Sequence, residues 1–464
     1  MRLLANALHN IRRHFMKTVL VDDVIDARPF GAFQLLVFAV CFVIALMDGA
    51  NIQTMGLSAP LLAADLKLLP TQLGPVFAGS EFGFMIGALA FGPLADRFGR
   101  KSILVLCTLL FGFASLATVQ ASSFHSLLLL RVVTGLGLGG AAPCFVSLTT
   151  EYVSQRLRAR VASLLWAAIP AGGVVAGFAG SALIPAYGWK SMFYLSGIVP
   201  IAAALVVVLL VPESVRFLIL TGASEKRVSR ILSRLGVTVG SGTSDAVHYV
   251  THEHETRGLP MLHLFREGRA SFTALLWIAF FLNFLALIAV LAWTSTLLKS
   301  AGMSVADASI VMAWNNVGGM IGVAAAGKLM ERLGTHRFPA LIFVCGAVMV
   351  GCTGVAAPHT ALVSLFSGLT GLFVGGATAG LIAIAAMGYP TAIRSTGVGY
   401  GLAAGRLGGA TGPVIVGTLV ASGMGVAQTY LFVSVPVVLA ALVMLLMRRA
   451  HPDDAQFVTG VIAH

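Results

Sequence analysis

The sequence predicts an all-α membrane protein in which twelve transmembrane helices form two six-helix pseudo-repeats, with both termini in the cytoplasm. Three observations lead to this fold class. The 464 residues are 58% hydrophobic and only 10% charged, whereas soluble proteins carry about 25% charged residues. Apolar runs long enough to cross a bilayer recur along the chain, and two motifs occur once in each half. Such a composition excludes an ordinary soluble protein, whose exterior must face water.

Twelve segments each offer about 20 consecutive apolar residues, the length that crosses a hydrocarbon core of about 30 Å. All are expected to be helices, because lipid offers no hydrogen-bond partner to an open strand edge. The 52 glycines favour close packing of these helices. In chain order the segments cover residues 32–58, 74–95, 102–121, 125–150, 160–184, 190–211, 272–298, 305–330, 338–357, 360–386, 395–421 and 427–447.

The polar segments divide the chain into five parts. We expect a cytoplasmic N-tail (1–31), an N-terminal bundle (32–211), a cytoplasmic linker (212–271), a C-terminal bundle (272–447) and a cytoplasmic C-tail (448–464). The linker carries His248, His252, Glu253, His254 and Glu255. This group is compatible with a metal site, but a solvated linker is the preferred interpretation, and we expect no metal and no cofactor. The five cysteines lie in apolar runs and are interpreted as packing residues.

The positive charges predict the orientation. With the N-terminus in the cytoplasm, the cytoplasmic segments hold 25 of the 30 lysines and arginines, and only Lys67, Lys190 and Lys299 lie on the other side. This asymmetry follows the positive-inside rule, so we expect a multi-pass protein of the bacterial inner membrane. It also accounts for the net charge of +12 without a nucleic-acid partner.

Two motifs repeat at nearly the same offset. Residues 92–99 (GPLADRFG) follow the second span, and residues 327–334 (GKLMERLG) follow the eighth, 235 positions later. Residues 134–141 (TGLGLGGA) and 370–377 (TGLFVGGA) match at an offset of 236. A duplication of six helices with a site between the halves is typical of alternating-access transporters.

The stretch 92–101 (GPLADRFGRK) resembles the loop motif of the major facilitator superfamily. The chain is most similar to the aromatic acid:proton symporter family, the carriers of benzoate, hydroxybenzoates and protocatechuate. The similar stretches are Asp48-Gly49, 130–139, Glu151-Tyr152, 212–217, 389–399 and 405–408. The sequence departs from the family pattern at Asn51, where the family has a second acid, and at Glu81, where a small residue is usual.

Three charged residues in the N-terminal spans have similar estimated depths. At ~1.5 Å per helical residue, Asp48 lies ~20–25 Å from the cytoplasmic face, and Glu81 and Arg131 lie ~10 Å below the opposite face. We expect Arg131 to pair with one or both carboxylates, and this cluster to carry the proton, with Glu81 replacing the acid lost at Asn51. Two alternatives are a fixed structural pair of Asp48 with Arg131, and a Glu81 that points into a solvated funnel.

Arg406 lies ~18 Å from the cytoplasmic face, near the midplane. We expect its planar guanidinium to bind the carboxylate of the substrate. An alternative is that Arg406 bonds backbone carbonyls or an acid across the interface. The other expected substrate-binding residues are polar or aromatic residues at comparable depths, with Trp314 stacking on the substrate ring: Asn51, Asn283, Trp314 and Asn315.

Charged helix ends predict a cytoplasmic gate. Ion pairs there can hold two bundles together in one state and release them in the other, and the resemblance implies that this loop stabilises the outward-facing state. An alternative is a loop that serves topology alone. The expected gating residues are Gly92, Asp96, Arg97, Gly99, Arg100 and Glu151.

The resemblance implies a secondary active transporter that takes up a small aromatic carboxylate by proton symport. Alternatives are a uniporter or exporter of another organic acid, and a transporter-like sensor of aromatic acids. No nucleophile–base pair or phosphate-binding loop indicates an enzyme or an ATP-driven pump. We expect a monomer in the lipid bilayer whose only other partners are the substrate and protons.

Overall fold

The computed structural model describes residues 18–26, 30–221, 225–234, 248–250, 260–266, 269–334, 337–390 and 393–450. The linker residues from His252 to Glu255 lie outside this part of the chain. Within it, groups of His, Cys, Asp and Glu that could hold a metal ion are absent.

The described part contains twelve long helical segments. They are α3 (Ala32–Asp65), α4 (Pro70–Phe98), α5 (Arg100–Thr118), α6 (Phe124–Glu151), α7 (Gln155–Tyr187), α8 (Lys190–Leu210), α11 (Ala270–Ser300), α12 (Val305–Leu333), α13 (Arg337–Val355), the segment Thr360–Gly388, α16 (Arg394–Ala421) and α17 (Val426–Ala450). The segment Thr360–Gly388 consists of α14 (Thr360–Thr370), the π-helical turn η2 (Gly371–Gly375) and α15 (Gly376–Gly388).

Eleven of these segments are long and apolar enough to cross a membrane. The twelfth, α16, is 28 residues long but rich in glycine and carries Arg394 and Arg406, which lowers its hydropathy. It packs against both α4 and α11. Twelve helices were predicted, and the all-helical bundle is confirmed; several helices, such as α3 and α7, extend beyond the predicted spans.

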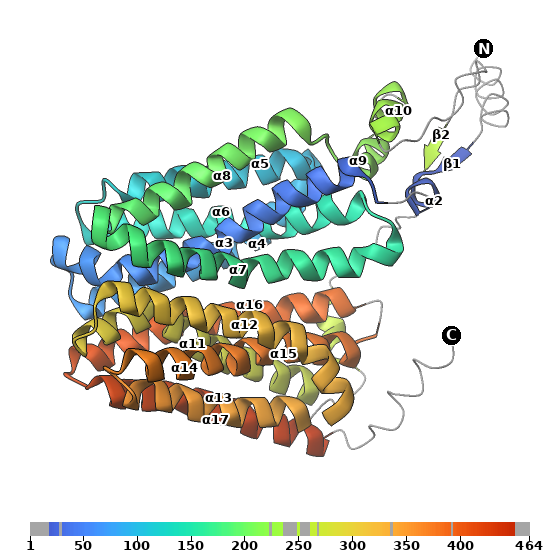
Figure 1. Ribbon diagram of the computed structural model, residues 1–464. Helices are drawn as coiled ribbons and strands as arrows, with labels where there is room; N and C mark the ends of the chain where they lie inside the picture. The colour runs from blue at the N-terminus through green and yellow to red at the C-terminus, as the bar shows by residue number, and fades with distance from the viewer. Residues whose placement is uncertain are drawn as a thin grey trace, which may run out of the picture.

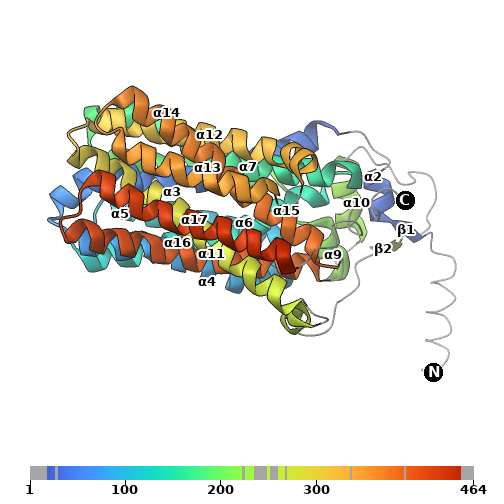
Figure 2. The same ribbon diagram turned by 90° about the horizontal axis from the view of Figure 1, so that it is seen from below.

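The helices form two halves that lie side by side, α3 to α8 in blue to green and α11 to α17 in yellow to red (Figures 1 and 2). We call the end where α3 begins and α17 ends the cytoplasmic end, following the orientation expected from the charges, and the other the periplasmic end. This sidedness and the five-part division of the chain stay predictions.

The predicted repeat has a structural counterpart in each half. Gly99 after α4 and Gly334 after α12 have φ values of +98° and +88°, a conformation that side chains with a Cβ rarely adopt. Gly83 of α4 lies against the backbone of α6 at Val132, and Gly318 of α12 lies against the backbone of α14 at Gly368. The same residues therefore allow the same close helix contact in both halves.

The two halves are joined mainly near the periplasmic end. One apolar core there combines residues of both halves, such as Phe77 of α4 and Trp293 of α11, whose ring centroids lie 5.7 Å apart. Gly74 of α4 lies against the backbone of α16 at Pro413. At the cytoplasmic end, a separate core contains described residues of the N-terminal half and its adjoining segments alone. The packing between the halves is thus asymmetric along the membrane normal.

Short elements gather at the cytoplasmic end (Figure 1). They are β1 (Thr18–Leu20), α2 (Val21–Asp26), α9 (Val215–Leu220), α10 (Glu225–Arg234), β2 (His248–Val250) and the 3₁₀ turn η1 (Pro260–Phe265). β1 and β2 pair in parallel, which joins the N-tail to the linker. The tail and linker were predicted only as polar segments, so these elements add to that prediction.

Candidate functional site

An ion pair joins the two halves inside the bundle. Glu81 of α4 and Arg406 of α16 lie 2.9 Å apart from Oε2 to Nη1, although 325 residues separate them in the chain. Their side chains are only 6% and 15% exposed. Gly409, three residues after Arg406, leaves room for the carboxylate, because a Cβ there would lie 3.3 Å from Glu81 Oε2. A charge pair at membrane depth is costly to bury and marks a functional site.

Two aromatic rings border the guanidinium. The Cζ atom of Arg406 lies 3.6 Å from the ring centroid of Phe84 and 5.8 Å from that of Phe284. Phe84 follows Glu81 by three residues on α4, so the two side chains share one helix face. The sequence analysis missed both rings, although the spacing of Glu81 and Phe84 was a usable signal. The rings hold the guanidinium plane by cation–π contact.

Asp48 of α3 belongs to the same charged cluster. Its carboxyl is 3% exposed and lies close enough to Arg406 and Glu81 for their charges to act on it. Within the described part of the chain, its Oδ1 atom has no hydrogen-bond partner. The structure therefore pairs Arg406 directly with Glu81 and places Asp48 within electrostatic range of both.

Arg131 lies outside this cluster, which corrects the pairing expected from depth. Its Nη2 donates to Thr118 Oγ1 at 2.6 Å, and its Cζ lies 5.1 Å from the Phe193 ring centroid. Thr118 donates to Ala114 O on its own helix, so its lone pairs are available to the guanidinium. Arg131 is fully buried between α5, α6 and α8 and makes no ion pair with any described residue.

The three predicted asparagines bond within their own halves. Asn51 Nδ2 donates to Ser115 Oγ at 2.7 Å, and Asn283 Nδ2 donates to Thr378 Oγ1 at 2.8 Å. Asn315 Nδ2 donates to the carbonyl and hydroxyl oxygens of Ser367 at 2.9 and 3.3 Å. All three are buried, and each joins two helices of one half. Asn283 keeps a buried Oδ1 atom without a partner in the described residues.

Trp314 points away from the interface between the halves. Its side chain is 47% exposed. Met312, two residues earlier, is buried in a cluster with Met47 and Ala50 of the other half. Side chains two positions apart on an α-helix differ by about 200° in direction. Trp314 therefore lies on the face of α12 opposite to Met312. The expected stacking of Trp314 on a substrate ring is therefore not supported by its position.

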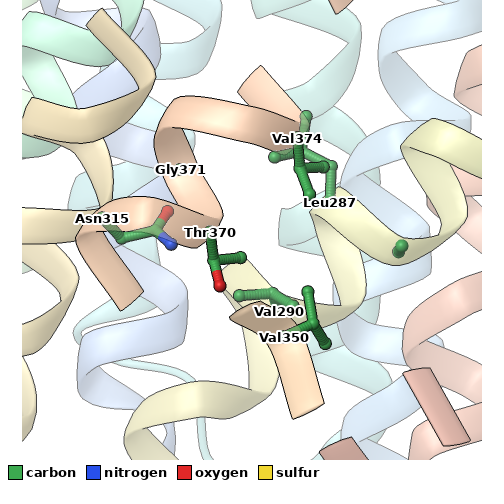
Figure 3. A pocket seen from close by; sticks show the side chains of 8 residues that line it. Leu287, Val290, Asn315, Val350, Thr370, Gly371 and Val374 are labelled. Carbon is green, nitrogen blue, oxygen red and sulfur yellow. The ribbon is translucent and has the colours of Figure 1, made fainter. Parts of the chain in front are cut away.

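A void between helices of the C-terminal half is too small to be a substrate chamber. The side chains of Asn315, Thr370, Val350 and Val374 converge on a narrow space beside η2 (Figure 3). The space is too narrow to admit a water-sized sphere. Asn315 thus borders a packing defect next to a π-helical turn, and its amide is already bonded to Ser367.

The predicted gating residues form a network at the cytoplasmic end. Arg100 makes an ion pair with Glu151, and its Nη2 lies 3.6 Å from Asp96 Oδ1. The Ser214 hydroxyl donates to Glu151. Each of these residues belongs to the N-terminal half or to the segment that follows α8. The network, as described, joins helices of one half, whereas the sequence predicted a contact between two bundles.

Glu213 completes this network and was missed as a site residue. Its carboxylate accepts from the backbone amides of Lys101 and Ser102 at 2.9 and 3.4 Å, which satisfies the N-terminus of α5. A Cβ at Gly99 would overlap this carboxylate. Tyr152 donates to Glu213 O at 2.8 Å. Burial, with the nearby Glu213 charge, raises the pKa of the Tyr152 phenol, so the hydroxyl remains a donor.

The other two loop residues make fewer contacts. Arg97 is exposed, and its Cζ lies 5.4 Å from the ring centroid of Phe98. A Cβ at Gly92 would meet no atom within 4 Å. Of Gly92 and Gly99, Gly99 is the one that must be glycine, because it has a positive φ and the Glu213 carboxylate approaches it closely.

Twelve helices in two repeated halves, with a buried ionic site where the halves meet, are typical of a multi-pass membrane transporter. Residues 39–363 match the family model for the Major Facilitator Superfamily. The chain belongs to the Major Facilitator Superfamily, and it is a multi-pass protein of the bacterial inner membrane.

The sequence is similar to curated transporters over nearly its whole length. It is 33% identical to the gallate transporter of Pseudomonas putida over 440 residues, which is 95% of this chain and 97% of that protein. It is 32% identical to the 4-hydroxybenzoate transporter PcaK of Pseudomonas aeruginosa over 437 residues, which is 94% of this chain and 97% of that protein. These relatives confirm the resemblance to the aromatic acid:proton symporter family.

The fold is similar to that of solved transporters. The crystal structure of a bacterial homologue of the human lysosomal transporter Spinster, in an inward-facing and unoccupied conformation, superposes with a TM-score of 0.71 at 18% identity. The match covers 92% of this chain and 99% of that chain. At this identity the similarity shows the fold alone.

Proposed function

We propose that the protein takes up a small aromatic carboxylate by proton symport and alternating access. The named substrates of its relatives, gallate and 4-hydroxybenzoate, support this substrate class. The observation that carries the proposal is the buried Glu81–Arg406 ion pair between the halves, bordered by two phenylalanine rings.

Arg406 binds the substrate carboxylate in this proposal. A guanidinium has several donors in one plane, and the bond to Glu81 uses Nη1. The carboxylate of the substrate competes with the Glu81 carboxylate for the Arg406 guanidinium, because each carboxylate can accept hydrogen bonds with two oxygens. Phe84 and Phe284 are the rings closest to the bound head group and provide apolar contact for an aromatic acid. Asn283 is a candidate for a ring hydroxyl, since its buried Oδ1 atom accepts no bond from the described residues.

The net charge of the cluster couples proton uptake to anion binding. In this proposal the guanidinium neutralises the carboxylate that it bonds, and the second buried carboxyl of the cluster holds the coupled proton. A substrate anion adds a third carboxylate. The cluster then takes up a second proton, which keeps its net charge unchanged. One proton is therefore transported with each bound anion. Arg131 has no part in this balance, because it is turned toward Thr118.

Alternating access requires that the halves part at one end while they meet at the other. The shared apolar core near the periplasmic end supports a state that is closed on that side. The gating residues Gly92, Asp96, Arg97, Gly99, Arg100 and Glu151 lie at the opposite end, where the N-terminal half has its own core. In this proposal the network around Glu151 bonds within the N-terminal half, which leaves the C-terminal half free to part from it at the cytoplasmic end.

The test is uptake by purified protein in liposomes. Labelled gallate, 4-hydroxybenzoate and benzoate are offered with and without an imposed pH gradient, acidic outside. We expect accumulation of at least one of these acids that rises with the gradient. Uptake that does not change with the pH gradient would reject symport and leave a uniporter. Asn51 favours this alternative, because its buried amide donates to Ser115 and carries no titratable proton. Absence of transport for every acid would reject the substrate class.

A further inference from the structure

A second charged site lies outside the transport pathway, at the cytoplasmic end. A cavity of about 390 Å³ opens between the start of α5, the end of α8 and the amphipathic helix α10. This volume lies within the range of small-ligand sites. Its polar lining comprises Lys101, Ser102, Glu213, Arg230 and Arg234.

The cavity is positively charged. Lys101, Arg230 and Arg234 face one acid, Glu213, whose carboxylate is already bonded by the backbone amides at the start of α5. Arg230 and Arg234 are four residues apart on α10, so both lie on the same helix face. Lys101 is held at the rim by the bond from its Nζ to Val208 O, at 2.9 Å. An anion entering the cavity meets an excess of positive charge.

Helix α10 is fixed in place. Its apolar residues Val228, Ile231 and Leu232 are buried in the core of the N-terminal half. This anchoring holds the two arginines on the outer face, where both are exposed. The apolar face of α10 is buried in protein, so at the end of a membrane-spanning bundle the helix presents its basic residues close to the membrane surface.

The apolar side of the cavity faces lipid. Leu209 and Leu210, the last residues of α8, are 77% and 46% exposed and line the same cavity. These residues belong to a spanning helix, so they contact acyl chains near the membrane surface. The cavity therefore has cationic groups on one side and a lipid-exposed apolar surface on the other.

We infer that this cavity binds the phosphate group of an anionic phospholipid of the inner leaflet. Its acyl chains lie along Leu209 and Leu210, and Arg230 and Arg234 hold the phosphate. Basic pockets on the cytoplasmic side of membrane proteins bind such headgroups. A free phosphate shares the headgroup chemistry, but it would leave the adjoining leucines without a role.

The test is native mass spectrometry of the full-length protein titrated with phosphatidylglycerol or with phosphatidylcholine. We expect wild type to retain phosphatidylglycerol preferentially. The affinity of the double variant R230Q/R234Q for phosphatidylglycerol should be about thirtyfold lower, since each basic side chain near an anionic lipid raises the affinity roughly fivefold. The matched control is K328Q/R332Q, which removes two exposed charges with the same spacing from the cytoplasmic end of α12.

Equal retention by R230Q/R234Q and the control would overturn the inference. A parallel arm measures the melting temperature in detergent with millimolar inorganic phosphate. Stabilisation by phosphate that depends on both arginines, with no preferential retention of phosphatidylglycerol, would identify a soluble-anion site and also overturn the lipid assignment. Gel filtration and the melting temperature without ligand show whether each variant is folded, and R230K/R234K, which keeps both charges, should restore retention.

Discussion

Arg406 is the residue on which the proposed site depends, because it contacts both halves. Its guanidinium lies over Phe84 of α4 and bonds Glu81 on the same helix, while its own helix belongs to the C-terminal half. Asp48 adds a second buried carboxyl from α3. At the scale of single residues, therefore, the chemistry is one cation shared between acids of the protein and the acid to be transported.

Substitution of Arg406 tests this role. R406A should weaken binding of an aromatic acid about thirtyfold or more, because loss of one partner of a buried charge pair costs at least ~2 kcal/mol. R406K should recover part of the affinity, since lysine keeps the charge but not the planar fork. Isothermal titration calorimetry measures both. Unchanged affinity in R406A would remove the arginine from the binding site.

The estimated depths are compatible with the Glu81–Arg406 pair, although the sequence analysis gave an acid across the interface only as the alternative partner of Arg406. Glu81, ~10 Å below the periplasmic face of a ~30 Å core, and Arg406, ~18 Å from the cytoplasmic face, lie at nearly the same level. Position along a helix says nothing about the direction of a side chain around it. For this reason Arg131, at the depth of Glu81, was expected to pair with it but points to Thr118, and Trp314 points outward.

At the scale of elements, glycines set how closely helices approach. Gly408 of α16 lies against the backbone of α11 at Phe281, and Gly83 and Gly318 make equivalent contacts in the two halves. Such contacts replace the hydrophobic driving force that is missing in lipid. The glycine-rich α16 is thereby held between α4 and α11, with Arg406 directed into their interface.

A pair of alanine substitutions on α16 tests this packing. In G408A the added Cβ overlaps the backbone of Phe281, so we expect a loss of about 1–3 kcal/mol in the free energy of unfolding. In G399A the Cβ meets no atom within 4 Å. Helix propensity then predicts no loss, or a gain of up to ~1 kcal/mol. Thermal unfolding in detergent distinguishes the two; equal melting temperatures would contradict this account of the packing.

At the scale of the whole molecule, the halves meet near the periplasmic end. Gly180 of α7 and Ser309 of α12 lie together there, and a Cβ at Gly180 would lie 3.4 Å from Ser309 Oγ. Motion between the halves is what transport requires. In the proposed mechanism this contact therefore breaks once in each transport cycle.

A disulfide at this contact tests the motion. The double variant G180C/S309C, in a background whose five native thiols are replaced, has the short spacing that a disulfide needs. We expect oxidation to block uptake in liposomes and reduction to restore it, while each single cysteine variant transports under both conditions. Full uptake by the oxidised, cross-linked protein would show that the halves do not separate there.

Much of the architecture was predictable because lipid imposes long apolar helices and the duplication repeats its glycines. The motif glycines Gly99 and Gly334, predicted from an offset of 235 residues, both have a positive φ. Contacts between the halves were not predictable, since they depend on the rotation of each helix and on how the halves dock. Glu213 was missed for a similar reason: its partners at the start of α5 lie more than 100 residues away.

The central claim is that Asp48, Glu81 and Arg406 couple anion binding to proton uptake, and the most direct test is to measure that proton. Substrate is added to purified protein in weakly buffered solution with a pH indicator, for wild type and for D48N/E81Q. We expect proton uptake on binding by wild type and none by the double variant, which still binds the anion through Arg406. Undiminished proton uptake by D48N/E81Q would contradict the account.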